Sequence, residues 1–151
     1  MSLLRRLVQK VRKNKGEKKV KIGLIVVVSV IVLFVAFMAI KIETKMQKTR
    51  EALDSQVNVE IDMKQVADGT YKASSGGGMV QVELEVEVKD HKIVNINLLK
   101  HECGKGKPAE SMIDEMMKNN TDDVYIVSGA TASSKFIRNA ANKALQCGLK
   151  E

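Results

Sequence analysis

A run of small residues rich in hydroxyl groups is the part of this sequence best suited to chemistry. It reads Ser128-Gly129-Ala130-Thr131-Ala132-Ser133-Ser134 and directly precedes an amphipathic segment. A helix that begins there would offer a phosphate group its free N–H groups and its positive dipole end. The hydroxyl groups in the run add hydrogen-bond donors. The run therefore predicts a phosphate site, with an ordinary helix N-cap as the alternative, because serine and threonine are favoured there.

The segments around this run predict an α+β domain, with helices packed against an antiparallel sheet. Apolar and polar residues alternate from Val80 to Lys89, which is typical of a half-buried strand. Asp90-His91 predicts a tight turn, and residues 93–99 predict the returning strand. Apolar residues at helical spacing predict one helix beginning at Pro108 and another from Ser133 to about Leu149.

Shorter signals complete the predicted order of elements. Asp68-Gly69 predicts a turn that opens the domain, and residues 74–78, Ser-Ser-Gly-Gly-Gly, form either a hairpin loop or a close approach to a ligand. Alternation over residues 57–61 predicts an entry strand, and residues 124–127 predict a short strand just before the hydroxyl-rich run.

Taken together, these motifs resemble the FMN-binding domain family, whose domain also occurs in flavin subunits of the Rnf complex and of the sodium-pumping NADH:quinone reductase. The run from Ser128 to Thr131 resembles the family signature, and Asp68-Gly69-Thr70-Tyr71 resembles its opening. The alternating hairpin is similar to the centre of the domain. His101, Gly104-Lys105-Gly106-Lys107 and Ala109-Glu110 resemble the small stand-alone members. The resemblance extends from Asp68 to Leu149.

The resemblance implies FMN as the cofactor. In the family, a separate flavin transferase that uses FAD and magnesium can attach FMN through its phosphate to the motif threonine, here Thr131. The candidate cofactor-binding residues beside Thr131 are Ser128, Gly129, Ala130, Ser133, Ser134, Tyr71, His101, Gly104, Gly106 and Tyr125. Gly104 and Gly106 either let their loop approach the flavin or are turn residues. His101 either bonds a polar edge of the flavin or has a structural role.

Tyr125 departs from the family pattern, which usually has an aspartate three residues before the motif serine. Asp122 and Asp123 lie nearby but out of register. The tyrosine either contacts the flavin ring or fills the core, which is the commoner fate of a lone tyrosine. Loss of the aspartate favours non-covalent over covalent FMN if the transferase needs that carboxylate.

An uncharged apolar segment, residues 22–40, predicts a single transmembrane helix. A cleaved secretory signal is the alternative, but such signals have shorter apolar regions, and Phe37-Met38-Ala39 has a bulky residue where a small one is needed. We expect a basic tail at 1–21, the span at 22–40, a charged stalk and entry segment at 41–67, and the FMN-binding domain at 68–151.

The charge distribution predicts an N-terminus in the cytoplasm and a domain outside it. Residues 1–21 hold nine basic side chains and one acidic side chain, and such a segment beside a membrane span stays in the cytoplasm. The remainder holds 16 basic and 17 acidic residues, so the domain lacks the charge of a nucleic-acid-binding surface.

The remaining reactive side chains do not predict an active site. Cys103, Cys147, His91 and His101 lack the spacing of a metal site, so we expect free or loosely paired thiols. No nucleophile with a neighbouring base accompanies the flavin motif. We therefore expect an electron carrier that exchanges electrons with a membrane donor, such as a quinone or a redox complex. The alternatives are an anchored binding or sensing module with non-covalent FMN or none, and a reductase with its own substrate.

Overall fold

The computed structural model describes residues 2–149, with side chains from residue 23 onward. The side chains of the basic tail therefore lie outside the described part. The chain divides into two compact units, one ending at Ile42 and the other beginning at Glu43. Each unit is described by itself.

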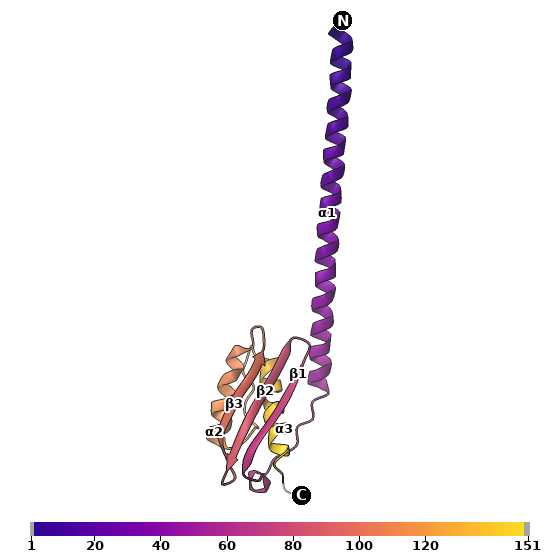
Figure 1. The fold of residues 1–151 in the computed structure, drawn as a ribbon. Helices are drawn as coiled ribbons and strands as arrows, with labels where there is room; N and C mark the ends of the chain where they lie inside the picture. The colour runs from indigo at the N-terminus through magenta and orange to yellow at the C-terminus, as the bar shows by residue number, and fades with distance from the viewer. Residues whose placement is uncertain (1, 150–151) are drawn as a thin grey trace. The chain divides into compact units, whose positions relative to one another are not determined.

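The first unit belongs to one long helix, α1 (Ser2–Asp54), which also supplies the start of the second unit (Figure 1). Its apolar side chains in residues 24–40 are exposed, and Leu33 exposes 69% of its surface. Among the described residues, this is the one helix long and apolar enough to cross a membrane. A signal sequence meets the same test of length and composition.

The second unit is built on a three-stranded antiparallel sheet in the order β1 (Gly69–Gly77), β2 (Val80–Lys89), β3 (Lys92–Glu102). The alternation along β2 is confirmed, because Val82, Leu84 and Val86 are all fully buried. The turn between β2 and β3 is also confirmed at Asp90 and His91, whose φ angles are 52° and 60°. Two positive φ angles are what a tight two-residue hairpin turn requires.

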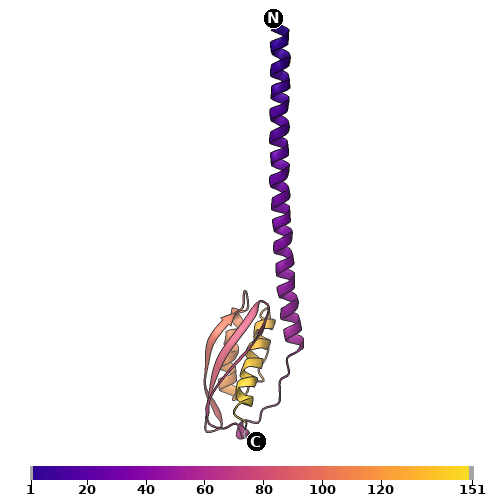
Figure 2. The same cartoon turned by 45° about the vertical axis from the view of Figure 1, so that its right-hand side comes forward.

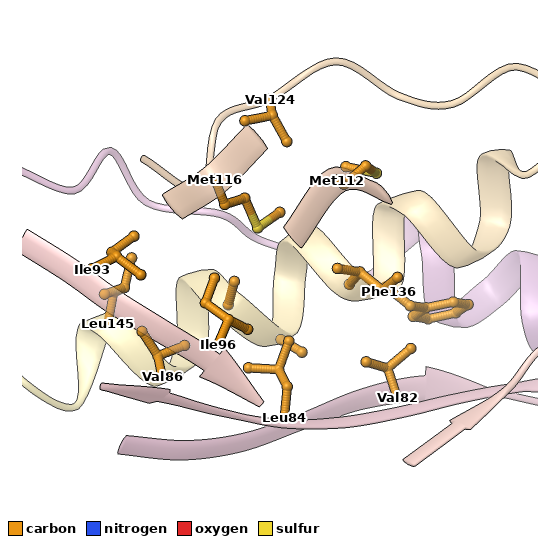
Figure 3. Packing of buried hydrophobic residues seen from close by; sticks show 14 of the residues in the cluster. Val82, Leu84, Val86, Ile93, Ile96, Met112, Met116, Val124, Phe136 and Leu145 are labelled. Atoms are coloured by element: carbon orange, nitrogen blue, oxygen red, sulfur yellow. The ribbon is translucent and has the colours of Figure 1, made fainter. Parts of the chain in front are cut away.

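Helices cover one face of this sheet (Figures 1 and 2). The 3-10 helix η2 (Lys107–Ser111) leads into α2 (Met112–Asn119), which packs against β3, whereas α3 (Thr131–Gln146) packs against β1 and β2. Met112, Met116 and Phe136 belong to one buried cluster with the apolar residues of the sheet, and Figure 3 shows part of this cluster. The observed fold is therefore the predicted two-layer α+β domain.

Two predicted short strands, at residues 57–61 and 124–127, are wrong, because both segments are irregular. The first has its backbone bonded by side chains of α3 rather than by a neighbouring strand. Asn142 accepts from the N–H of Val59 at 3.0 Å and donates to its carbonyl at 2.7 Å, and Asn139 donates to the carbonyl of Val57 at 3.3 Å. These amides satisfy the backbone groups that a strand partner would otherwise bond.

Helix α1 continues through residues 41–54, within the segment that the sequence assigns to a charged stalk, and its end contacts the β1–β2 hairpin. Thr49 is buried, and its hydroxyl lies 2.8 Å from the carbonyl of Gly77 and accepts from the N–H of Met79 at 3.0 Å. A Cβ on Gly78 would collide with the carbonyl oxygen of Lys45. Gly77 and Gly78 of this hairpin therefore allow a close approach to α1. Of the predicted loop 74–78, only Gly78 is in the hairpin turn, because residues 74–77 belong to β1.

Replacing Gly78 with alanine is expected to destabilise the second unit more than replacing Gly104 does. Both glycines have positive φ, so either alanine adds strain of about 1–2 kcal/mol. Only Gly78→Ala also creates a collision, because nothing lies within 4 Å of a Cβ on Gly104. Overpacking should lower the free energy of unfolding by a further ~1–3 kcal/mol. Denaturant unfolding of the two variants checks this, and equal losses would contradict it.

Candidate functional site

The turn before α3 is shaped by Gly129, whose φ of +79° is rarely adopted by residues with a side chain. Nothing lies within 4 Å of a Cβ built on Gly129, so the turn borders open space. Ser128 and Thr131 are exposed beside it, whereas Ala130 is buried and fixes the turn to the core. The turn therefore presents its backbone and two hydroxyl groups to solvent.

The N-cap alternative for the hydroxyl-rich run is wrong. Ala130 is the N-cap residue of α3, and no side chain caps the helix. Ser134 instead accepts from the N–H of Val127 at 3.1 Å, which holds the preceding segment against α3. The helix thus begins with its dipole end uncapped by any side chain and with the Thr131 hydroxyl exposed in its first turn.

Ser133 faces the opposite flank, toward the loop that joins β3 to η2. A Cβ on Gly106 would collide with the Ser133 side chain. Gly106 therefore lets its loop approach α3 closely. His101 is the second-to-last residue of β3, just before this loop, and its side chain is 3% exposed. Its Nδ1 lies 2.8 Å from the Glu110 carboxylate.

Two buried polar atoms, His101 Nε2 and the Ser133 hydroxyl oxygen, have no hydrogen-bond partner among the residues that the structure describes. Buried polar groups are normally hydrogen-bonded, so each of these atoms marks a place where a ligand atom or a water molecule completes the structure. Gly104, with φ +50°, is exposed in the same loop.

The two tyrosines predicted to contact the flavin lie in different places. Tyr71 donates to the carbonyl of Ala67 at 2.9 Å and packs against Gly148, beyond the C-terminal end of α3. The 16 residues of α3, about 24 Å at the usual rise, separate that end from Thr131. Tyr125 lies close to the turn in sequence and is 92% exposed, so the interpretation of Tyr125 as a core residue is wrong.

A groove around Arg138 was missed from the sequence. Three adjoining hollows of about 420, 380 and 220 Å³ share Arg138 in their lining. We define the Arg138 groove by the residues that line these hollows, which are Leu53, Gln56, Asn58, Val59, Glu60, Ile61, Thr121, Asp122, Asp123, Val124, Tyr125, Ile126, Lys135 and Arg138. One signal was available in the sequence, because Thr131, Lys135 and Arg138 follow each other at helical spacing.

Comparison with protein-family models decides the identity of the domain. Residues 76–146 match the model of the FMN-binding domain. The domain belongs to the FMN-binding domain family. No curated protein matches the chain. The matched range contains the turn before α3, the His101 flank and most of the Arg138 groove, whereas Tyr71 lies outside it.

Membership of the FMN-binding domain family indicates FMN as the cofactor, and the residues around Thr131 suit it. The uncapped start of α3 and the exposed hydroxyl groups of Ser128 and Thr131 suit a phosphate. Lys135 is exposed one turn further along the helix and adds a positive charge. The unpartnered atoms of His101 and Ser133 supply further polar groups in the FMN-binding domain.

The two cysteines lie apart in the fold, Cys103 in the loop between β3 and η2 and Cys147 just after α3. Cys103 and Cys147 are both free thiols, Cys103 partly exposed and Cys147 exposed. Within the part of the chain that the structure describes, no group of three or more metal-ligating side chains occurs.

Proposed function

We propose that this protein is a membrane-anchored electron carrier whose FMN is attached through its phosphate to Thr131. One observation carries the proposal: in an FMN-binding domain, Thr131 is an exposed residue in the first turn of a helix that no side chain caps. An acceptor hydroxyl must be reachable by a modifying enzyme, and the attached phosphate must have donors beside it. Both requirements are met at this turn.

Attachment at Thr131 follows simple chemistry. The hydroxyl oxygen of Thr131 forms a bond to the FMN phosphorus of FAD as the bond from that phosphorus to AMP breaks, and the hydroxyl proton leaves. A flavin transferase with magnesium supplies this step. The N–H groups at the start of α3 and the Lys135 ammonium group then neutralise the phosphodiester. When bound, FMN supplies the one- and two-electron chemistry, and the protein supplies its position.

The apolar helix and the charge distribution support an extracytoplasmic location. Residues 22–40 would span the membrane, with the basic segment 1–21 on the cytoplasmic side. The FMN-binding domain then lies outside the cytoplasm, where a membrane donor such as a quinone or a redox complex reduces it.

A second candidate function is an anchored binding or sensing module with non-covalent FMN or none. It is favoured by Tyr125, which occupies the place of the family aspartate. The neighbouring carboxylates are both occupied elsewhere, since Asp122 accepts from Asn142 at 2.7 Å and Asp123 pairs with Arg138. Neither aspartate is therefore free to replace the missing one.

Flavin analysis of the full-length chain tests these functions. The protein is expressed with a flavin transferase, purified from membranes in detergent and denatured before its absorbance and intact mass are measured. A mass gain of one FMN minus water supports the covalent carrier. Flavin released on denaturation supports the non-covalent module, and the absence of flavin contradicts both FMN-dependent functions.

Restoring the aspartate should raise the covalent FMN content. Tyr125→Asp places a carboxylate where the family usually has one, and Tyr125→Asn serves as the uncharged control of similar shape. Because Tyr125 is 92% exposed, neither change should alter folding. Intact mass gives the modified fraction of each variant. An equal fraction in Tyr125→Asp, Tyr125→Asn and the unchanged chain would show that the carboxylate has no role in attachment.

A further inference from the structure

The turn of the β1–β2 hairpin lies beside the part of α1 that comes first in the second unit. A Cβ built on Gly77, at the end of β1, would meet the side chain of Ala52 and the carbonyl of Lys48. A Cβ on the next residue, Gly78, would meet the carbonyl of Lys45, about one turn of helix nearer the N-terminus. The turn is therefore the end of the hairpin that is directed toward the start of the second unit.

This part of α1 follows the predicted membrane span closely in the chain. Lys45 is five residues after Ile40, the last residue of the apolar segment. Five residues reach at most about 18 Å in any conformation, and in a helix they advance about 8 Å. The polar layer on each side of a bilayer is roughly 5–8 Å thick. The hairpin turn is therefore within reach of lipid head groups when the apolar segment spans the bilayer.

An apolar side chain is exposed at the hairpin turn. Met79, the second residue of the turn, is 48% exposed, although its backbone N–H is fixed by the buried Thr49 hydroxyl at 3.0 Å. On the neighbouring helix Met46 is 44% exposed. Exposed apolar side chains among charged ones are typical of surfaces that insert shallowly into the head-group layer of a membrane.

Basic side chains predominate on the part of the stalk that is nearest the span. Residues 41–50 hold four basic side chains and one acidic side chain, whereas Glu51 and Asp54 are farther from the span. Lys45 and Lys48 are both exposed. Lysines next to a membrane attract anionic head groups and keep their ammonium groups in the polar layer. We define the hairpin–stalk surface by the residues Lys45, Met46, Lys48 and Met79.

We propose that the hairpin–stalk surface docks on the anionic head-group layer of the membrane that α1 spans. The inference rests on the membrane anchor of the proposed function. Met46 and Met79 insert among the head groups, and the ammonium groups of Lys45 and Lys48 pair with lipid phosphates. Because the Thr49 hydroxyl is bonded on both sides of the hairpin turn, the sheet is held to the docked helix. The FMN-binding domain thus has a second contact with the membrane that holds its redox donor.

Nitroxide labels on single cysteines test this contact. The full-length chain is loaded with FMN by a flavin transferase, after Cys103 and Cys147 have been replaced by serine. Met79→Cys carries the label at the hairpin turn. Val94→Cys is the matched control, because Val94 is also apolar and 48% exposed. By the pairing of β3 with β2, it lies about 24 Å along β2 from the turn.

The labelled proteins are reconstituted into vesicles of phosphatidylcholine and phosphatidylglycerol that also contain a nickel-chelating lipid. Nickel at the head groups relaxes a nitroxide only when the two are close. We expect relaxation of the label in Met79→Cys to exceed that in Val94→Cys several-fold. Adding Lys45→Gln and Lys48→Gln to Met79→Cys should lower its relaxation several-fold. Equal relaxation at the two labelled positions, or no effect of the glutamines, overturns the proposal.

Flotation of the same vesicles separates this inference from the proposed function. A chain that floats with the vesicles after a wash at high pH is anchored, and equal relaxation at the two labels then overturns the docking alone. A chain that does not float overturns the membrane anchor and this inference together.

Discussion

Replacing Thr131 with alanine is expected to abolish covalent attachment of FMN while the domain stays folded. Thr131 supplies the only hydroxyl that the family motif places at the acceptor position, and its side chain is exposed, so its methyl and hydroxyl groups contribute little to the core. Intact mass measured after co-expression with a flavin transferase should show the whole mass gain in the unchanged chain and none in Thr131→Ala.

Two matched variants make this expectation specific. Thr131→Ser keeps a hydroxyl at the same position and should retain part of the modification. Ser128→Ala removes the other exposed hydroxyl of the turn and should leave covalent attachment in place. A full mass gain in Thr131→Ala, or its loss in Ser128→Ala but not in Thr131→Ala, would show that the acceptor lies elsewhere.

Replacing Phe136 with alanine is expected to lower the free energy of unfolding of the second unit by more than any other substitution named above. Phe136 is 1% exposed on α3 and lies over Val82 of β2 in Figure 3. Removing a buried phenyl ring leaves a cavity and costs about 3–5 kcal/mol, a large share of the ~5–15 kcal/mol by which a domain is usually stable. Thermal unfolding followed by circular dichroism should show a strongly lowered midpoint.

Lys143→Ala is the control for Phe136→Ala, because it changes an exposed side chain on the same helix. Its free energy of unfolding should stay within about 0.5 kcal/mol of that of the unchanged chain. If Phe136→Ala unfolds at the same temperature as Lys143→Ala, the helix is not held by the core that the structure shows.

The regular elements could be predicted because their signals are local. The alternation along β2 repeats every two residues, and Asp90-His91 lies between two such strands. The segment at 57–61 was misjudged because its conformation depends on partners that are distant in sequence. The backbone of residues 57–59 is bonded by Asn139 and Asn142, more than 80 positions away, and no local pattern reports such partners.

The parts of the site that could be predicted also have local signals, whereas the parts that were missed depend on contacts between distant residues. The turn at Gly129 could be predicted because a glycine among small polar residues, placed just before an amphipathic segment, indicates a turn locally. The Arg138 groove combines α3 with residues from 53–61 and 121–126, and the first of these segments is distant from α3 in sequence. Tyr125 had two interpretations, a flavin contact or a core residue, because the sequence predicted a strand at 124–127. That strand does not form, and Tyr125 is exposed.

Electron carriage is tested most directly by a reductive titration of the full-length protein, purified from membranes after co-expression with a flavin transferase. The absorbance of the bound flavin is followed as reductant is added without oxygen and as an oxidant is then returned. The account predicts one FMN per chain that takes up two electrons and gives both back, with the flavin still attached. A chain without flavin, or a flavin that cannot be reduced and reoxidised in place, would contradict it.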